Sequence, residues 1–452
     1  MLTKEDNEIL TRVGPGTPMG NLLRRYWLPA LLSSEVPAPD SPPIRVRLLG
    51  EDLVAFRDTD GNVGLFVQAC PHRGASLFFG RNEECGLRCV YHGWKYDVDG
   101  NCVDMPSEPA ESNFKSKVRV TAYPTHESGG IIWTYMGPQE KMPGFRDFGS
   151  ESVPREQWRA SKVISYCNWI QGLEGNIDTS HISFLHSGYV PSRPPRYPEG
   201  DETDRPGYPS MAMRGFIHRT VGAPDLEVFD TWYGFRYAGI RKSPAGLLNV
   251  RVSDFIMPLF TYVPQPYLPI GGDSCIMMVP IDDEAYWRWS IDMKPAMRQA
   301  QLPRWGHEMP AMGLRTAATP TSTPPGLQQR TQFAENDYLI DRELQRTRSY
   351  TGIEGIPQQD MAVTESMGHI YDRTKEHLGT TDKAIIRMRR MLIEAAKDLA
   401  RGVEPAALDP NLPYEKIRSA ERNILPADDW RILGTDEDPI VKELLPAIAA
   451  TR

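Results

Sequence analysis

The sequence predicts an α+β protein in which a small β-rich module precedes a larger domain of mixed strands and helices. The chain has 452 residues, which is enough for two or three domains. Short runs rich in β-branched and aromatic residues fill residues 40–140, with no helical period to compete with them. After residue 146, strand-like and helix-like runs alternate, and two proline-rich segments interrupt them.

Composition excludes several classes of protein. Aspartate and glutamate outnumber lysine and arginine by 59 to 51, and aromatic residues make up 9% of the chain. A nucleic-acid-binding protein would be basic, and a disordered chain would be poorer in aromatic residues. The sequence contains no run of 18 apolar residues, so it predicts no membrane span. The charged opening MLTKEDNEIL does not resemble a secretory signal. We therefore expect a folded cytoplasmic protein.

Residues 1–39 are predicted to form a helical segment that packs on the second domain, and residues 40–145 to form the β-rich module. Strands are predicted in this module at Ile44–Leu49, Leu53–Arg57, Val63–Val67, Val118–Tyr123 and Ile131–Tyr135.

Residues 146–452 are predicted to form the larger domain. A helix-like stretch covers Trp169–Leu185, and a C-terminal helix is expected where apolar residues from Ile385 to Leu399 recur at helical spacing ahead of Gly402. Strands are predicted at Glu227–Tyr237, Leu247–Phe255, Ser274–Ile281 and Tyr286–Met293.

Two short loops of the β-rich module carry a metal-ligand pattern. The segment CPHRG supplies Cys70 and His72, and the segment CVYHGW supplies Cys89 and His92. A structural zinc site could use these four ligands. However, each loop offers one thiolate and one imidazole, so that one iron can take both sulfurs and the other iron both histidines, which is the ligand set of a Rieske [2Fe-2S] cluster. Cys85, Cys102, Cys167 and Cys275 are expected to be free thiols.

A second constellation lies in the helix-like stretch. Asp178 and His181 are three residues apart and would share a helical face, whereas His181 and His186 are five apart and meet at one metal only if the helix distorts or ends between them. The alternative is two ordinary histidines. A chain with a one-electron centre needs an acceptor, and a site of two histidines and one carboxylate is an iron(II) arrangement that activates oxygen.

The motifs CPHRG, CVYHGW and NxxxxEGxxDxxHxxxLH, in this order, resemble the oxygenase α subunit of Rieske non-heme iron ring-hydroxylating oxygenases. The segments GEDLVAFRDTDG and YHGWKYDVDGN further resemble the phthalate 4,5-dioxygenase branch. The resemblance implies an all-β Rieske domain, a helix-grip catalytic domain, a [2Fe-2S] cluster and a mononuclear Fe(II). It also implies that His181, His186 and Asp341 bind this iron, with Asp337 as the competing carboxylate.

The resemblance further implies an assembly and a substrate class. Asp178 would link His181 to His92 of the partner subunit, which requires a homotrimer or stacked trimers that form a hexamer. Thr179, Arg205 and Arg241 match positions that bind the carboxylates of an aromatic acid, although the sequence departs from the branch between Pro191 and Ser210.

The expected activity is the addition of both atoms of O2 to phthalate or a related aromatic carboxylate, giving a cis-dihydrodiol. A separate NAD(P)H-dependent flavin and iron–sulfur reductase would supply electrons, since no glycine-rich nucleotide-binding fingerprint follows a strand. A monooxygenase or O-demethylase acting on a substituted benzoate would carry the same motifs. A non-catalytic electron carrier or a zinc-stabilised module is the alternative outside this class, and it would leave most of the chain without a role.

Overall fold

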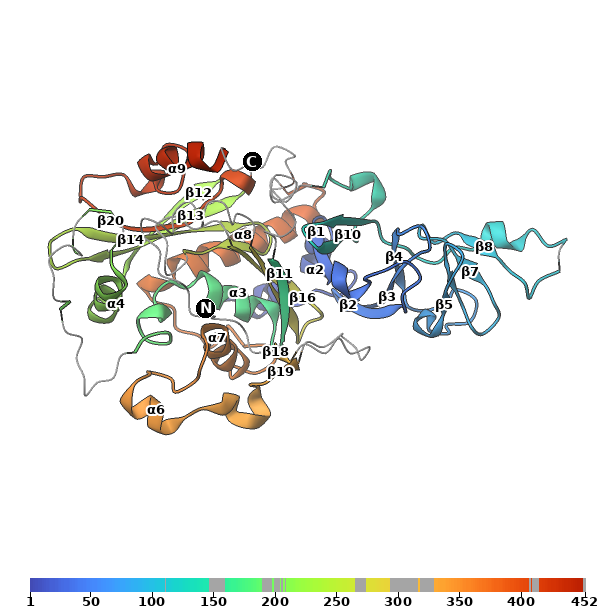
Figure 1. Ribbon diagram of the computed structural model, residues 1–452, viewed down its shortest axis with the longest axis horizontal. Coiled ribbons are helices and arrows are strands. Elements are labelled where there is room, and N and C mark those ends of the chain that lie inside the picture. Colours follow the sequence, from blue (N-terminus) through green and yellow to red (C-terminus); the bar gives the residue numbers. More distant parts are fainter. Residues whose placement is uncertain are drawn as a thin grey trace.

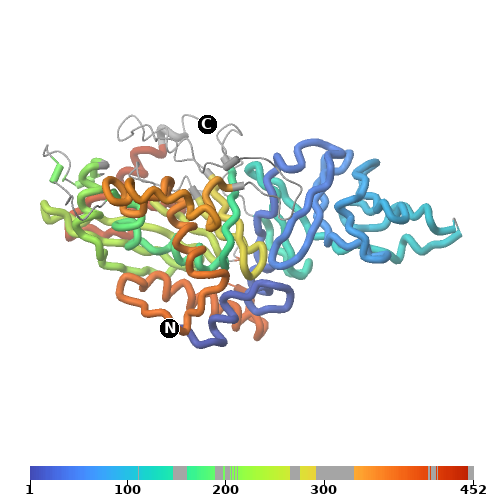
Figure 2. Tube along the Cα trace, turned by 90° about the horizontal axis from the view of Figure 1, so that it is seen from below, coloured from blue at the N-terminus to red at the C-terminus, as the bar shows by residue number. Residues whose placement is uncertain are grey.

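The structure is a computed structural model, elongated in both views, with the N-terminal β-rich module at one end (Figures 1 and 2). It describes residues 1–109, 111–145, 159–188, 197–198, 204, 206–207, 209–264, 274–292, 316–317, 329–405, 408 and 414–449.

Three small antiparallel sheets form the N-terminal end of the molecule. Their strands, in sheet order, are β1 (Trp27–Leu32), β10 (Ile131–Tyr135) and β9 (Thr125–Ser128); β2 (Ile44–Leu48), β3 (Glu51–Arg57) and β4 (Val63–Val67); and β5 (Arg81–Asn82), β6 (Leu87–Arg88), β7 (Lys95–Tyr96) and β8 (Cys102–Asp104).

Strand β3 separates two hydrophobic cores. Its side chains alternate between the two faces of the sheet, as the period of two in a strand requires. Leu53 and Ala55 belong to the main core of the molecule, whereas Val54 and Phe56 belong to a smaller core that also contains Cys70 and Cys89. The β-rich end is therefore packed firmly against the rest of the chain while it keeps a core of its own.

One eight-stranded antiparallel sheet forms the frame of the larger domain. Its strands run in the order β11 (Arg159–Ser165), β17 (Tyr286–Asp292), β16 (Ser274–Pro280), β15 (Phe260–Tyr262), β14 (Leu248–Ile256), β13 (Gly234–Lys242) and β12 (Asp225–Thr231), and β20 (Ala420–Ile424) also pairs with β14. A separate two-stranded sheet joins β18 (Thr316–Ala317) to β19 (Gln329–Arg330).

Helices cover this sheet on both faces (Figure 1). Helix α9 (Pro439–Ala449) supplies Val441 to an apolar cluster with Val250 and Val252 of β14. The N-terminal helices α1 (Lys4–Thr11) and α2 (Pro18–Leu23) pack against α8 (Lys383–Ala400). The remaining helices are α3 (Trp169–Ile177), α4 (Met211–Thr220), α6 (Arg342–Thr347) and α7 (Ile356–Glu365).

The observed architecture confirms the predicted fold class, with four corrections to its elements. Residues 27–32, inside the segment predicted to be helical, form strand β1, which pairs with β10 of the N-terminal module. Residues 118–123 form only isolated bridges, at Arg119 and Ala122, rather than a strand. The single strand predicted at Glu227–Tyr237 is a hairpin of β12 and β13. The helix predicted to reach Leu185 ends at Ile177.

None of the helices in the described parts of the chain combines the length and the hydrophobicity that a bilayer span requires.

Candidate functional site: two metal centres

The two Cys–His loops of the N-terminal module have matching backbone geometry. The amide N–H of Gly74 donates to the carbonyl oxygen of Cys70 at 2.9 Å, and that of Gly93 donates to the carbonyl oxygen of Cys89 at 2.9 Å. Gly74 and Gly93 have φ angles of +75° and +79°, a region that favours glycine. The loops therefore turn tightly after each histidine, as the sequence indicates.

The four side chains divide into a buried pair and a half-exposed pair. The two cysteines are 2% and 3% exposed, and the two histidines lie nearer the surface with ring centroids 4.4 Å apart. Trp94 stacks on His72 at a centroid distance of 4.1 Å. Two thiols on one side and two imidazoles on the other match the division of ligands between the two irons of a Rieske cluster.

A single zinc ion does not fit these loops. In the described part of the chain, which includes both loops, only one set of three His, Cys, Asp or Glu ligand atoms lies within 4.8 Å of one another, and it contains none of these four residues. A tetrahedral zinc ion needs all its ligands about 2.0–2.3 Å from one point. A two-iron cluster spans a wider gap, and the buried Nδ1 atom of His92 has no hydrogen-bond partner, which leaves it free to bind metal.

The thiols also need a counter-charge. Burial raises the pKa of Cys70, and the neighbouring Cys89 raises it further, whereas a hydrogen bond with Tyr96 acts in the opposite direction. Two adjacent buried thiolates are unfavourable without a cation. Bound iron supplies that cation, because a coordinating thiol is deprotonated.

The second site begins where α3 ends. Asp178 is the C-cap of α3 and has extended backbone angles, so it does not share a helical face with His181 as the spacing predicts. A short 3-10 turn, His181–Ser183, follows, and the amide N–H of Leu185 donates to the carbonyl oxygen of His181 at 2.8 Å. This coil of turns, rather than a continuous helix, brings His181 and His186 together.

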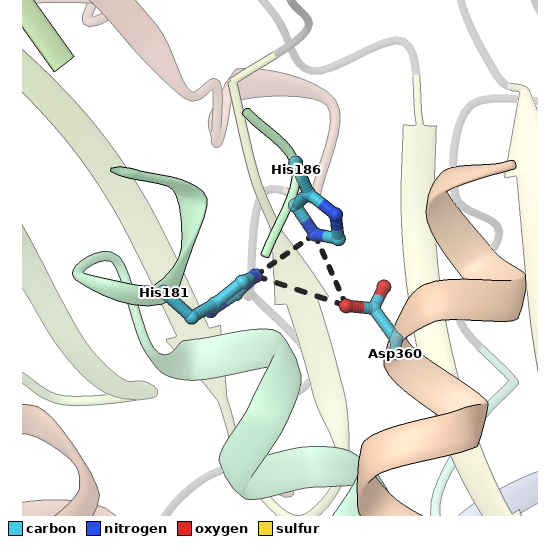
Figure 3. Close-up of side chains that lie close together, drawn as sticks. All are labelled: His181, His186 and Asp360. Atoms are coloured by element: carbon cyan, nitrogen blue, oxygen red, sulfur yellow. Dashed lines mark hydrogen bonds and ion pairs between the residues drawn. The ribbon is translucent and has the colours of Figure 1, made fainter. Parts of the chain in front are cut away.

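Three side chains converge at this point (Figure 3). The Nε2 atoms of His181 and His186 are 3.0 Å apart. An oxygen of Asp360, from α7, lies 3.1 Å from Nε2 of His186 and 3.8 Å from Nε2 of His181. Two imidazoles and one carboxylate whose ligand atoms point at one another fit a mononuclear iron site with open positions.

The outer nitrogen of each histidine has its own partner. Nδ1 of His181 lies 3.4 Å from Oδ2 of Asp178, and Nδ1 of His186 lies 2.7 Å from Oε1 of Gln359. Such contacts orient the ring and fix which nitrogen carries the proton. Both rings are thereby set to present Nε2 to a metal.

The protonation states suit a cation as well. Although burial disfavours its ionised form, the pKa of Asp360 is lowered by the hydrogen bond with His186 and by the positive charges of its neighbours. Burial lowers the pKa of His186, but Asp360 outweighs this effect and raises it. A cation bound between them would take over the role of that proton.

The structure does not bring Asp341 to the histidines. Asp341 is exposed and caps α6, where its carboxylate accepts a hydrogen bond from the amide N–H of Leu344 at 2.8 Å. Asp337 is also exposed, at a φ of +51°. The carboxylate in contact with the histidines is Asp360. The signal in the sequence was an acidic residue in an otherwise uncharged stretch, IPQQDMAVT.

The residues predicted to bind substrate lie in different settings. Arg241 is fully buried and donates to the carbonyl oxygen of Thr179 at 3.0 Å and to Oγ of Ser183 at 3.2 Å. Thr179 is 3% exposed, and its hydroxyl has no hydrogen-bond partner in the described part of the chain. Arg205 lies outside the described residues.

Comparison with known proteins agrees with this pair of centres. Residues 26–124 match the model of the Rieske [2Fe-2S] domain, and residues 134–447, well over half the chain, match the model described as LigXa C-terminal domain like. The chain belongs to the Rieske non-heme iron ring-hydroxylating oxygenases, as the sequence motifs indicate. It is an oxygenase component, and its cofactors are a Rieske [2Fe-2S] cluster and a mononuclear iron.

Curated relatives differ in the substrates that their names state. The chain is 38% identical to the phthalate 4,5-dioxygenase oxygenase subunit of Pseudomonas putida, over 95% of this chain and 94% of that one. It is 39% identical to the 3-chlorobenzoate-3,4-dioxygenase oxygenase subunit of Comamonas testosteroni, over 95% and 97%. It is 45% identical to the tert-butanol monooxygenase / tert-amyl alcohol desaturase oxygenase subunit of Aquincola tertiaricarbonis, over 94% and 82%.

Among solved structures, dicamba monooxygenase bound to dicamba aligns with a TM-score of 0.53 over 85% of this chain and 100% of that chain. At 16% sequence identity this likeness confirms the fold alone.

Proposed function

We propose that this chain is the oxygenase component of a dioxygenase that adds both atoms of O2 to phthalate or a related aromatic carboxylate, giving a cis-dihydrodiol. The observation that carries the proposal is the convergence of His181, His186 and Asp360 in a chain that also carries the Rieske loops. A set of two histidines and one carboxylate holds iron and leaves open positions beside it. A non-catalytic electron carrier would need only the Rieske loops.

In this proposal the side chains hold the iron and position the substrate. His181, His186 and Asp360 are the iron ligands, and Cys70, His72, Cys89 and His92 are the cluster ligands. Iron at the first set supplies oxygen activation. Asp178 and Gln359 keep the two imidazoles in one orientation.

Electrons would reach the cluster from a separate NAD(P)H-dependent flavin and iron–sulfur reductase. The curated relatives named above are themselves described as oxygenase subunits, which is consistent with a separate reductase.

A homotrimer, alone or stacked into a hexamer, is proposed as the functional assembly. Strand β7, which follows the second cluster loop, lies toward the far end of the elongated chain from α3, which precedes the iron histidines (Figure 1). Electron transfer is therefore favoured between neighbouring subunits, with Asp178 linking His181 to His92 of the partner subunit. We also propose the domain division 1–39, 40–145 and 146–452, with α1 and α2 of the first segment packed against α8.

Thr179, Arg205 and Arg241 are proposed to bind the substrate carboxylates. Arg241 supports this role in two ways. It fixes the backbone of Thr179 beside the iron ligands, and its Nη1 atom is buried without a hydrogen-bond partner. An arginine fork matches the geometry of a carboxylate.

The test is a single turnover of chemically reduced, iron-loaded protein with phthalate under heavy-isotope O2, followed by mass spectrometry of the product. A dihydrodiol with two heavy oxygens supports the proposal. Absence of product, from protein whose spectrum shows an intact Rieske cluster, contradicts phthalate as substrate.

The second candidate is a monooxygenase or O-demethylase acting on a substituted benzoate. The 45% identity to a protein named as a tert-butanol monooxygenase supports monooxygenation, and the 34% identity to a protein named as a 5,5'-dehydrodivanillate O-demethylase oxygenase subunit supports an aromatic ether as substrate. In the same experiment, with methoxybenzoates as substrates, demethylation would hydroxylate the methyl carbon with one oxygen atom of O2, reduce the other to water and release formaldehyde. A hydroxybenzoate that keeps its ether oxygen and carries no heavy oxygen, together with formaldehyde, would support the demethylase against dioxygenation.

A further inference from the structure

One face of the large sheet is polar although it is buried. The pairing register of β13, β14 and β20 places Gly239 opposite Arg251 and Arg251 opposite Glu421. Directly paired residues of antiparallel strands share a face, as do residues two apart along one strand. The face defined by Arg251 carries Tyr237, Gly239, Arg241, Asn249, Ser253, Glu421 and Asn423, and all are buried.

This buried polar face lies against the iron-site loop. A Cβ atom built on Gly239 would lie 2.7 Å from Cγ2 of Thr179, so Thr179 rests directly on the sheet beside Arg251. The opposite face carries Val250 and Val252, which pack with α9.

Among the described residues, two nitrogens of Arg251 have no hydrogen-bond partner. The residue is 9% exposed, and its Nε and Nη1 atoms are buried without a partner. Glu421, its paired neighbour, is engaged by α4 instead: its carboxylate oxygens lie 2.9 Å from Nε of Arg214 and 3.0 Å from Nε2 of His218. A buried guanidinium with open donors is costly unless an acceptor fills the space beside it.

The charges on this face do not balance. Arg214, Arg241 and Arg251 carry three positive charges against Glu421, and the nearby Asp178 is occupied by His181 and Ser180. Burial lowers the pKa of Arg251, Glu421 acts in the opposite direction, and the charge of Arg214 lowers it further. A small anion beside Arg251 would restore the balance.

We propose that Arg251 is a specificity-determining residue that binds an anionic group of the substrate, a carboxylate in the class of substrate proposed above, on the buried sheet face beside the iron ligands. This inference rests on the proposed function for the identity of the ligand. Arg251 adds to the three predicted substrate residues, and it is placed by sheet register rather than by resemblance.

The test compares a carboxylate with its neutral amide of nearly the same shape. Calorimetric titration of the iron-loaded, oxidised protein with benzoate and with benzamide gives the preference for the anion. In Arg251→Gln we expect benzoate affinity to fall about 10- to 100-fold, because a hydrogen bond to a charged group is lost. Benzamide affinity should change less than about threefold, since the site then loses a charge rather than its shape.

Two further variants separate this role from a structural one. Arg387→Gln removes one positive charge from the surface of α8, where Arg387 pairs with Asp230, and should leave both affinities unchanged. Arg251→Lys keeps the charge and should restore part of the preference for benzoate. Equal loss of benzoate and benzamide binding in Arg251→Gln, or no loss of either, overturns the inference.

The proposed function can fail separately. One outcome is that the unaltered protein binds acetate, Arg251→Gln does not, and neither benzoate nor phthalate binds. That result supports the anion site and contradicts the proposed aromatic substrate. If it binds benzoate equally well with and without Arg251, the inference falls and the proposed function stands. If it binds no carboxylate, both fall.

Discussion

Asp178 contacts His181 on the side of the ring opposite to the iron ligands: Oδ2 lies 3.4 Å from Nδ1, while Nε2 of the same ring faces His186 at 3.0 Å. The other oxygen, Oδ1, accepts two hydrogen bonds from Ser180, both at 2.7 Å. Burial disfavours the charge, but these contacts lower the pKa of Asp178 and keep it ionised. One imidazole therefore separates a fixed negative charge from the proposed iron.

Asp178→Asn should slow electron delivery while both metal centres stay filled. The amide preserves the shape of the side chain but removes the charge that orients His181, so we expect the substrate-dependent reoxidation of the reduced cluster to slow by at least about 10- to 100-fold. Stopped-flow absorbance of the cluster measures this rate. Asp372→Asn is the matched control, because Asp372 bonds only Thr374 and Lys375 at the surface. An unchanged rate in Asp178→Asn would remove it from the electron path.

Asp360→Ala and Asp341→Ala should differ in iron content. Asp360→Ala removes the carboxylate that contacts both histidines, so the mononuclear iron should be lost while the cluster spectrum persists. Asp341→Ala should keep its iron and lose about 0.5–2 kcal/mol of stability, because it removes the cap of α6. Metal analysis and thermal unfolding measure the two effects. Iron loss in Asp341→Ala alone would instead support the carboxylate that the sequence motif favours.

Gln359→Leu should weaken iron binding without abolishing it. The amide oxygen of Gln359 accepts from Nδ1 of His186, and its Nε2 donates to the carbonyl oxygen of Ile353 at 2.8 Å, so the whole side chain is fixed. Loss of such an orienting partner typically costs about 10- to 100-fold in metal affinity. Competition with a chelator reports that affinity. Gln358→Leu, at the adjacent buried position, is the control, and equal weakening in both variants would argue for a general effect on α7.

Local patterns predicted the local features of this protein. The strand Val63–Val67 and the strand Ile131–Tyr135 have the predicted bounds, and the Cys–His loops turn at the glycines that follow each histidine. The hairpin at Trp232–Tyr233 could not be predicted because two aromatic residues give no turn signal. The glycine that follows, Gly234, packs so closely on the next strand that a Cβ atom would lie 2.1 Å from the carbonyl oxygen of Phe255.

Features that depend on contacts between segments far apart in the sequence could not be predicted. Asp360 meets His186 because α7 packs against α3, a contact that no local motif encodes. Asp341, the carboxylate that the family resemblance favours, instead caps the start of α6. The alternation of Asn249, Arg251 and Ser253 with apolar residues reads as a strand with its polar face in water. In the structure that face is buried, and sequence periodicity does not distinguish a solvent-exposed polar face from a polar binding surface.

The same buried face gives the protein a pH-dependent stability centred on His218. Burial lowers the pKa of His218 to about 4, although Glu421 acts in the opposite direction. An unfolded histidine titrates near 6.5, so between about pH 6.5 and pH 4 the unfolded chain binds a proton that the folded chain does not, and stability falls as the pH falls.

Between pH 7 and pH 5 the free energy of unfolding is expected to fall by about 2 kcal/mol because of His218. The variant His218→Gln should lose most of this pH dependence. Glu421 contributes only below about pH 4.5, because its own pKa is lowered and its stabilisation is lost only when the unfolded carboxylate gains a proton. The measurement is the thermal midpoint of each protein at pH 7 and at pH 5. The drop in midpoint between the two pH values is expected to be several degrees smaller in the variant. His377→Gln, at an exposed histidine, should retain the full pH dependence of the unaltered protein. If His218→Gln retains it as well, the acid sensitivity arises elsewhere, and His218 is not kept neutral by its burial beside Glu421.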